Sequence, residues 1–256
     1  MGRKIFIDEL TWDEFTKGKY DTALLPIGTI ECHGKVLPLG TDTYIATAVA
    51  VLTARKCETA LVMPPLYYSF TGATSSLGGA ISVPMSIQAI FLKHLIKNLW
   101  EQGFNKIILI SIHGPNNIAI PMVVREIFEE YKIPALFFNP YKIATKYSSD
   151  IPWLEHTLLM ASLKVLNKEH LMENLKNLKT EKSVPLPASL ANIFEKGGVI
   201  GYYYTDVTQH LPQRENIKIE EGYKILNEIV NELMDLIKNL DIYVKYVIEK
   251  YHRAKG

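Results

Sequence analysis

The sequence has little cysteine and no pair of cysteines at metal-binding spacing. Its 256 residues include 2 cysteines, Cys32 and Cys57, which do not form a Cys-x-x-Cys motif. We therefore expect neither a disulfide framework nor a zinc site made of thiolates. A reducing compartment, the cytoplasm, is the expected location.

Neither sign of charge is in excess, and long apolar runs are absent. The chain has 28 Lys and Arg residues against 27 Asp and Glu residues, a formal net charge of +1. This balance gives no electrostatic reason to expect nucleic acid or an anionic membrane, so we expect a small-molecule substrate. No apolar stretch approaches the roughly 18 residues of a membrane span. The N-terminal segment turns acidic at Asp8 and Glu9, which argues against a signal peptide.

Short apolar runs alternate with segments of helical periodicity. The predicted strands are 23–27, 60–63, 106–112 and 135–138, and the predicted helices are 42–56, 86–100, 118–131, 153–166 and 220–240. This alternation predicts an α/β fold with three layers, α/β/α, around a mostly parallel central sheet. We expect a single domain over residues 1–256, with a frayed tail at 249–256.

Candidate metal ligands follow two of the predicted strands. Glu31 and His33 come directly after the first strand, and residues two apart in an extended segment point the same way. A carboxylate and an imidazole suit zinc, manganese or ferrous iron. His113 follows the strand 106–112, and open α/β sheets bind ligands at the carboxyl ends of their strands. If the two strands are parallel in one sheet, all three side chains meet in one crevice.

Asp42 has two interpretations. It stands at the start of a predicted helix, where an aspartate is commonly an N-cap. Alternatively, it joins Glu31, His33 and His113 in a set of two carboxylates and two imidazoles, which could hold one or two ions. The stretch 68–84, rich in Gly, Ser and Thr, predicts a long loop that could form a wall or lid of such a site.

Four segments of the sequence resemble the creatininase (creatinine amidohydrolase) family. They are 25–34 (LPIGTIECHG) and 37–42 (LPLGTD), which resemble the family's signature, 111–116 (SIHGPN), which resembles its Asn-Gly-His-Gly-Gly-Asn turn, and 154–158 (LEHTL), which resembles its Glu-Thr-Ser segment. The resemblance covers about residues 5–166. It implies a creatininase-like fold, a homo-oligomer, often a hexamer, and two divalent metal ions per chain, either zinc, manganese or iron.

The resemblance also implies a ligand set. Carried over by position, Glu31, His33, Asp42 and His113 become metal ligands, with Asp42 as the bridge between the two ions. Glu155 becomes the remaining carboxylate ligand. The alternative for Glu155 is an acidic residue in the first turn of a helix, where the helix dipole favours it.

Two positions depart from the family pattern. The position two residues after the turn histidine, a glutamate ligand in creatininase, is Pro115 here, so the second ion would rely on Glu155. The family's catalytic histidine is replaced by Asp150. Asp150, His156 or His210 could take over the acid–base role, with Glu155 as a further catalytic candidate, and the sequence does not choose among them.

Together these residues predict a metal-dependent amidohydrolase. Metal-activated hydroxide would attack the carbonyl carbon of a small cyclic amide or formamide, and a nearby acid would protonate the nitrogen that leaves as the C–N bond breaks. The departures argue against creatinine itself as the substrate. One alternative is a hydrolase that opens an inositol-derived cyclic diketone at a C–C bond. The other is a non-catalytic module that binds a metal ion or a small ligand.

Overall fold

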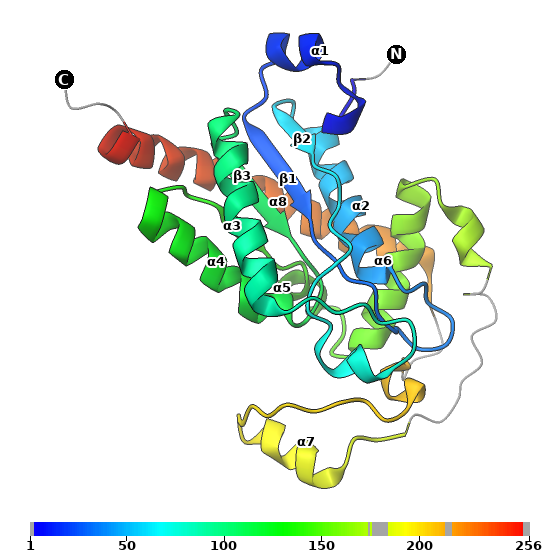
Figure 1. Cartoon of the computed structure of the whole chain (residues 1–256). Helices are drawn as coiled ribbons and strands as arrows, with labels where there is room; N and C mark the ends of the chain where they lie inside the picture. Colours follow the sequence, from blue (N-terminus) through cyan, green and yellow to red (C-terminus); the bar gives the residue numbers. More distant parts are fainter. Residues whose placement is uncertain (1–2, 174, 176–183, 213–216, 253–256) are drawn as a thin grey trace.

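The computed structural model of the chain describes residues 3–173, 175, 184–212 and 217–252 (Figure 1). The strands are β1 (Thr22–Pro26), β2 (Ala60–Val62), β3 (Lys106–Ile110) and β4 (Leu136–Phe138). The α-helices are α1 (Trp12–Lys17), α2 (Thr41–Lys56), α3 (Met85–Glu101), α4 (Asn116–Tyr131), α5 (Tyr141–Ala144), α6 (Ile151–Val165), α7 (Ala188–Glu195) and α8 (Ile219–Val247). Short 3-10 segments are η1 (Ile7–Glu9), η2 (Gly72–Ser76), η3 (Glu169–Met172) and η5 (Val207–His210), and the π-helix η6 spans Ile248–His252.

The four strands form one sheet with the order β2-β1-β3-β4, and every pairing is parallel. β1 lies between β2 and β3, with Ala23 opposite Leu61 on one side and Ile107 on the other. Each predicted strand is present with its ends within two residues of the prediction. The parallel sheet confirms the predicted fold class.

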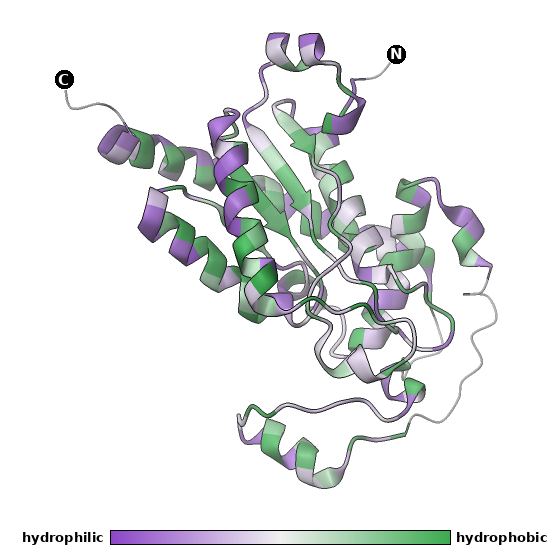
Figure 2. Cartoon of the chain, viewed as in Figure 1, coloured by the Kyte–Doolittle hydropathy of each residue, from purple (hydrophilic) through white to green (hydrophobic). Residues whose placement is uncertain are grey.

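Helices cover both faces of the sheet, which gives the three predicted layers. Because successive strand residues point to opposite faces, Leu24 and Ile108 pack toward α2, α6 and α8, whereas Leu25 and Leu109 pack toward α3 and α4. Figure 2 shows mostly hydrophobic strands between helices in which hydrophobic and hydrophilic residues alternate. The continuous apolar runs of the strands therefore reflect burial on both sides.

Several element ends differ from the prediction. The N-cap of α2 is Gly40, and no side chain caps this helix, so the N-cap interpretation of Asp42 is wrong. Glu155 lies in the second turn of α6, not the first. The C-terminal helix α8 continues past the predicted end to Val247. Of the tail predicted to fray, 249–252 belong to η6 and 253–256 lie outside the described residues.

Helices α3 and α4 carry exposed apolar side chains on their outer faces. Those more than half exposed are Ile87, Ile90, Phe91, Ile118 and Met122. Neighbouring exposed apolar side chains of this kind mark surfaces that associate with other proteins. Among the described helices, none combines the length and the apolar character that crossing a membrane requires.

Candidate metal centre

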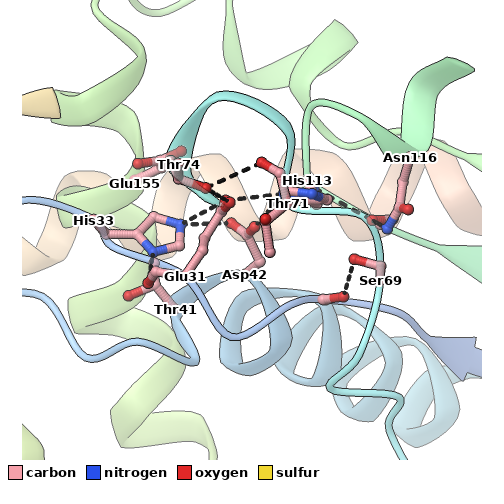
Figure 3. Close-up of polar contacts among 12 residues, drawn as sticks. Glu31, His33, Thr41, Asp42, Ser69, Thr71, Thr74, His113, Asn116 and Glu155 are labelled. Carbon is pink, nitrogen blue, oxygen red and sulfur yellow. Dashed lines mark hydrogen bonds and ion pairs between the residues drawn. The ribbon is translucent and has the colours of Figure 1, made fainter. Parts of the chain in front are cut away.

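Four of the predicted ligands meet at the carboxyl edge of the sheet. Glu31 and His33 follow β1, His113 follows β3, and Asp42 lies in the first turn of α2. Because β1 and β3 are adjacent and parallel, the segments that leave their carboxyl ends lie side by side, and the four side chains converge (Figure 3). All four are buried, with exposed fractions of 6% or less.

The first ligand group consists of Glu31, Asp42 and His113. Nδ1 of His113 lies 2.9 Å from Oδ2 of Asp42 and 3.0 Å from Oε1 of Glu31. Nε2 of His113 donates a hydrogen bond to the carbonyl oxygen of Phe70 (2.8 Å). That bond places the ring proton on Nε2 and leaves Nδ1 facing the carboxylates. The hydroxyl of Thr74 donates to the other carboxylate oxygen of Glu31.

The second ligand group consists of His33, Glu155 and His210, whose ligand atoms all lie within 4.8 Å of one another. Nδ1 of His33 donates to the carbonyl oxygen of Glu31 (3.1 Å), and its Nε2 lies 3.2 Å from Oδ1 of Asp42. Asp42 therefore presents one oxygen to each group. Two ligand atoms on one tetrahedral zinc ion, each about 2.1 Å from it, would lie about 3.4 Å apart. The 3.2 Å between Nε2 of His33 and Oδ1 of Asp42 is close to this distance.

Glu155 is held by two hydrogen-bond donors. The hydroxyl of Tyr141 donates to Oε1 (2.5 Å), and Nε2 of His210 lies 2.5 Å from Oε2. Burial raises the pKa of Tyr141, and the Glu155 carboxylate raises it further, so the hydroxyl keeps its proton at neutral pH. No motif in the sequence pointed to Tyr141. Thr74 lies in the loop that was predicted to form a wall of the site.

The charges of the centre favour a bound cation. Burial lowers the pKa of His33 and His113, but the surrounding carboxylates outweigh it and raise both values to about 10. Burial raises the pKa of Asp42, but the two histidines hold it well below its usual range. The negative potential that holds protons on these rings also attracts divalent cations, which compete with protons for the same nitrogens.

The residues present fit divalent metal ions. The donor set contains only carboxylate oxygens and imidazole nitrogens, which zinc, manganese and iron accept. His33 and His113 each give one ring N–H to a backbone carbonyl and aim the other nitrogen at the carboxylates. Metal-binding histidines in proteins are usually oriented by hydrogen bonds of this kind.

The remaining candidates for the acid–base role lie in different environments. Asp150 is the N-cap of α6, and its carboxylate accepts a hydrogen bond from the backbone N–H of Trp153 (3.2 Å). Nδ1 of His156 donates to the carbonyl oxygen of Pro152 (3.1 Å), and burial lowers the pKa of this ring. His210 lines the cavity beside the centre, whereas Asp150 and His156 are not among its described lining residues.

This cavity has a volume of about 700 Å³. Its ionisable acidic and histidine side chains are Glu31, Asp42, His113, Glu155 and His210, and Thr71, Thr74 and Ser75 add further polar groups. The other lining residues are mostly apolar or aromatic: Phe70, Met85, Pro115, Ile118, Ile151, Phe194, Val199, Ile200, Tyr202, Tyr203 and Tyr204. The predicted loop contributes 70–75, so its prediction as a wall of the site agrees with the structure.

Comparison with known proteins identifies the family of the chain. The Creatininase family model, described as creatinine amidohydrolase, matches residues 8–201. The 3-dehydro-scyllo-inosose hydrolase of Thermotoga maritima is 30% identical over 46% of this chain and 38% of its own length. The creatinine amidohydrolase of Pseudomonas putida is 27% identical over 54% of this chain and 59% of its own length. The matches to these two relatives thus span less than two thirds of their length.

A third relative matches nearly end to end. The 2-amino-5-formylamino-6-ribosylaminopyrimidin-4(3H)-one 5'-monophosphate deformylase of Methanococcus maripaludis is 21% identical over 88% of this chain and 95% of its own length.

Solved structures share the fold. A Bacteroides fragilis protein, provisionally assigned as a creatinine amidohydrolase, superposes with a TM-score of 0.75 at 22% identity, covering 94% of this chain and 97% of that chain. A manganese form of creatininase superposes with a TM-score of 0.71 at 18% identity, covering 93% and 98%.

Proposed function

Because the chain belongs to the creatininase family, whose members are hydrolases, we propose that it hydrolyses the C–N bond of a small, uncharged cyclic amide or formamide. One observation carries this proposal. Two groups of side chains that could ligate metal ions lie on either side of Asp42, which faces both, and they border a cavity large enough for a small molecule. Paired ions at the polar end of an otherwise apolar pocket are typical of hydrolytic sites.

Two divalent ions per chain are proposed. Glu31, Asp42 and His113 would hold the first, and His33, Asp42 and Glu155 would hold the second. When bound, the ions would supply an activated water at neutral pH and would polarise the substrate carbonyl. Zinc and manganese are the metals of related creatininase structures, and iron stays a prediction.

The chain's own residues orient the ligands. The carbonyl oxygens of Phe70 and Glu31 fix the two histidine rings, and Tyr141 fixes Glu155. Glu155 carries a hydrogen-bond donor on each oxygen, which favours its ionised form, so we assign it to metal binding, and its catalytic role stays a prediction. Catalytic roles for Asp150 and His156 stay predictions.

The cavity wall indicates the character of the substrate. Its described lining residues include no Lys or Arg, so outside the metal centre they offer no cationic side chain for a phosphate or carboxylate. Aromatic and aliphatic side chains instead favour an uncharged, partly apolar molecule. A phosphorylated formamide, as in the name of the Methanococcus maripaludis relative, would find no such partner among these residues.

The experiment is a hydrolysis panel with the zinc- and manganese-loaded protein. It contains neutral cyclic amides, neutral formamides, a phosphorylated formamide and an inositol-derived cyclic diketone, and it uses Glu31→Gln as the control. We expect turnover of a neutral amide that a chelator and Glu31→Gln both abolish. Turnover of the diketone alone would support the C–C bond alternative, as in the name of the Thermotoga maritima relative. Two bound ions without turnover on any compound would support the binding module.

Assembly and location are also proposals. The exposed apolar faces of α3 and α4 support the homo-oligomer that the family resemblance implies. The hexamer, the cytoplasmic location and the single domain over 1–256 stay predictions.

A further inference from the structure

The second ligand group contains one residue from outside the motifs that predicted the site. His210 ends the short helix η5, yet Nε2 of its ring lies 2.5 Å from Oε2 of Glu155. Its ligand atom lies within 4.8 Å of those of His33 and Glu155. The side chain is 16% exposed, so it is largely shielded from bulk water.

The local structure builds this position for His210. Asp206 caps η5, because its carboxylate accepts from the backbone N–H of Thr208 (2.7 Å). Gly34 has φ +74°, and a Cβ there would lie 2.9 Å from the carbonyl oxygen of His210. The absence of a side chain at Gly34 therefore lets the backbone of η5 approach the segment that carries His33. The two rings, of His33 and His210, meet edge to face with centroids 5.5 Å apart.

We propose that His210 is a protein ligand of the second ion, together with His33, Asp42 and Glu155. This inference rests on the proposed function, in that it requires the metal centre proposed above. Two imidazoles and two carboxylates would supply four protein ligands of the kinds that zinc accepts, and water or substrate would add a fifth. Pro115, which lines the same cavity, offers no side-chain ligand atom.

This ligand ties the cavity wall to the metal centre. Aromatic rings follow one another from His210 to Tyr204, Tyr202 and Phe194, with centroid distances of 6.3, 5.9 and 5.1 Å. The wall also contacts η2, because the backbone N–H of Tyr204 donates to the carbonyl oxygen of Ala73 (2.9 Å). An ion bound by His210 would fix one end of this wall and so couple metal binding to the shape of the substrate pocket.

The test is a calorimetric titration of the metal-free protein with Zn²⁺, and separately with Mn²⁺. His210→Ala removes the ring, and His210→Gln keeps an N–H that can donate to Glu155 but replaces the imidazole ligand. The matched control is His94→Ala, because His94 lies exposed on α3. Circular dichroism of each variant verifies that it is folded.

We expect wild type and His94→Ala to bind two ions with unchanged affinities. Both His210 variants should bind the first ion normally and the second about 100-fold more weakly or not at all, since changes to groups that merely hydrogen-bond a ligand already cost about 10–100-fold. Normal binding of the second ion by His210→Gln would overturn the proposal and leave His210 as a positioning residue for Glu155. Absence of metal binding in wild type would instead refute the proposed metal centre itself.

Discussion

The shared carboxylate of Asp42 gives the sharpest test of the metal centre. Its Oδ1 faces His33 at 3.2 Å and its Oδ2 faces His113 at 2.9 Å, so removing its charge should affect both ions. Glu31 contacts His113 at 3.0 Å and lies farther from His33, at 3.8 Å. Asp42→Asn should therefore abolish binding of both ions, whereas Glu31→Gln should abolish binding of the first ion alone.

The expected change in melting temperature follows from the linkage between metal binding and folding. Free metal at 100 times the dissociation constant stabilises the folded protein by about 2.7 kcal/mol per site. Two sites contribute twice this amount, and a protein of this size shifts its melting temperature by about 2–4 °C per kcal/mol. Wild type should therefore melt roughly 10–20 °C higher with metal than with chelator. Glu31→Gln should keep about half of that difference, and Asp42→Asn should show almost none.

The assay compares each protein with itself, with metal and with chelator, which removes any effect of the substitution on the metal-free fold. Metal analysis gives the number of ions per chain for the same samples. Asp150→Asn is the matched control, because Asn caps helices as well as Asp and Asp150 caps α6. Its metal-dependent shift should equal that of wild type. An Asp42→Asn protein that keeps half or more of the wild-type shift would refute the shared-ligand reasoning.

Three further substitutions test the fold and the assembly of the protein. Gly28→Ala would place a Cβ 2.1 Å from Oγ1 of Thr43 and should destabilise the protein by about 3 kcal/mol in urea unfolding; a loss near zero would contradict the close approach of the segment after β1 to α2. Asp21 pairs with the buried Lys106 (2.7 Å); burial raises the pKa of Asp21, but the hydrogen bonds from Lys106, Thr59 and Thr22 together outweigh burial and lower it. Asp21→Asn should therefore lower the free energy of unfolding by about 1 kcal/mol at neutral pH. This difference from wild type should vanish as the pH falls through the lowered pKa, because a protonated Asp21 no longer pairs with Lys106. A difference that persists in acid would exclude the ion pair as its cause. Phe91→Asp should shift the mass measured by light scattering toward the 29.0 kDa monomer, whereas an unchanged oligomer would show that α3 lies outside its interfaces.

The sequence by itself determined the layers and most of the metal centre. Burial of the strands on both faces makes their sequences almost continuously apolar, and the apolar residues of the helices recur with a period of 3.6 residues. Both kinds of element can therefore be recognised from short stretches of sequence. The carboxyl ends of parallel strands lie at the same edge of the sheet, where ligands bind, so Glu31, His33 and His113 are expected to lie together there. Their convergence was predicted from the sequence for this reason.

Only the tertiary structure decided the remaining contacts of the site. Whether Asp42 caps its helix or faces the centre depends on how α2 docks on the sheet, and because the N-cap is Gly40, two residues earlier, Asp42 is free to face the centre. The proximity of His210 depends on η5 packing against Gly34, far away in the chain. No local period encodes such a contact, because it arises from the packing of segments whose sequences carry no shared pattern.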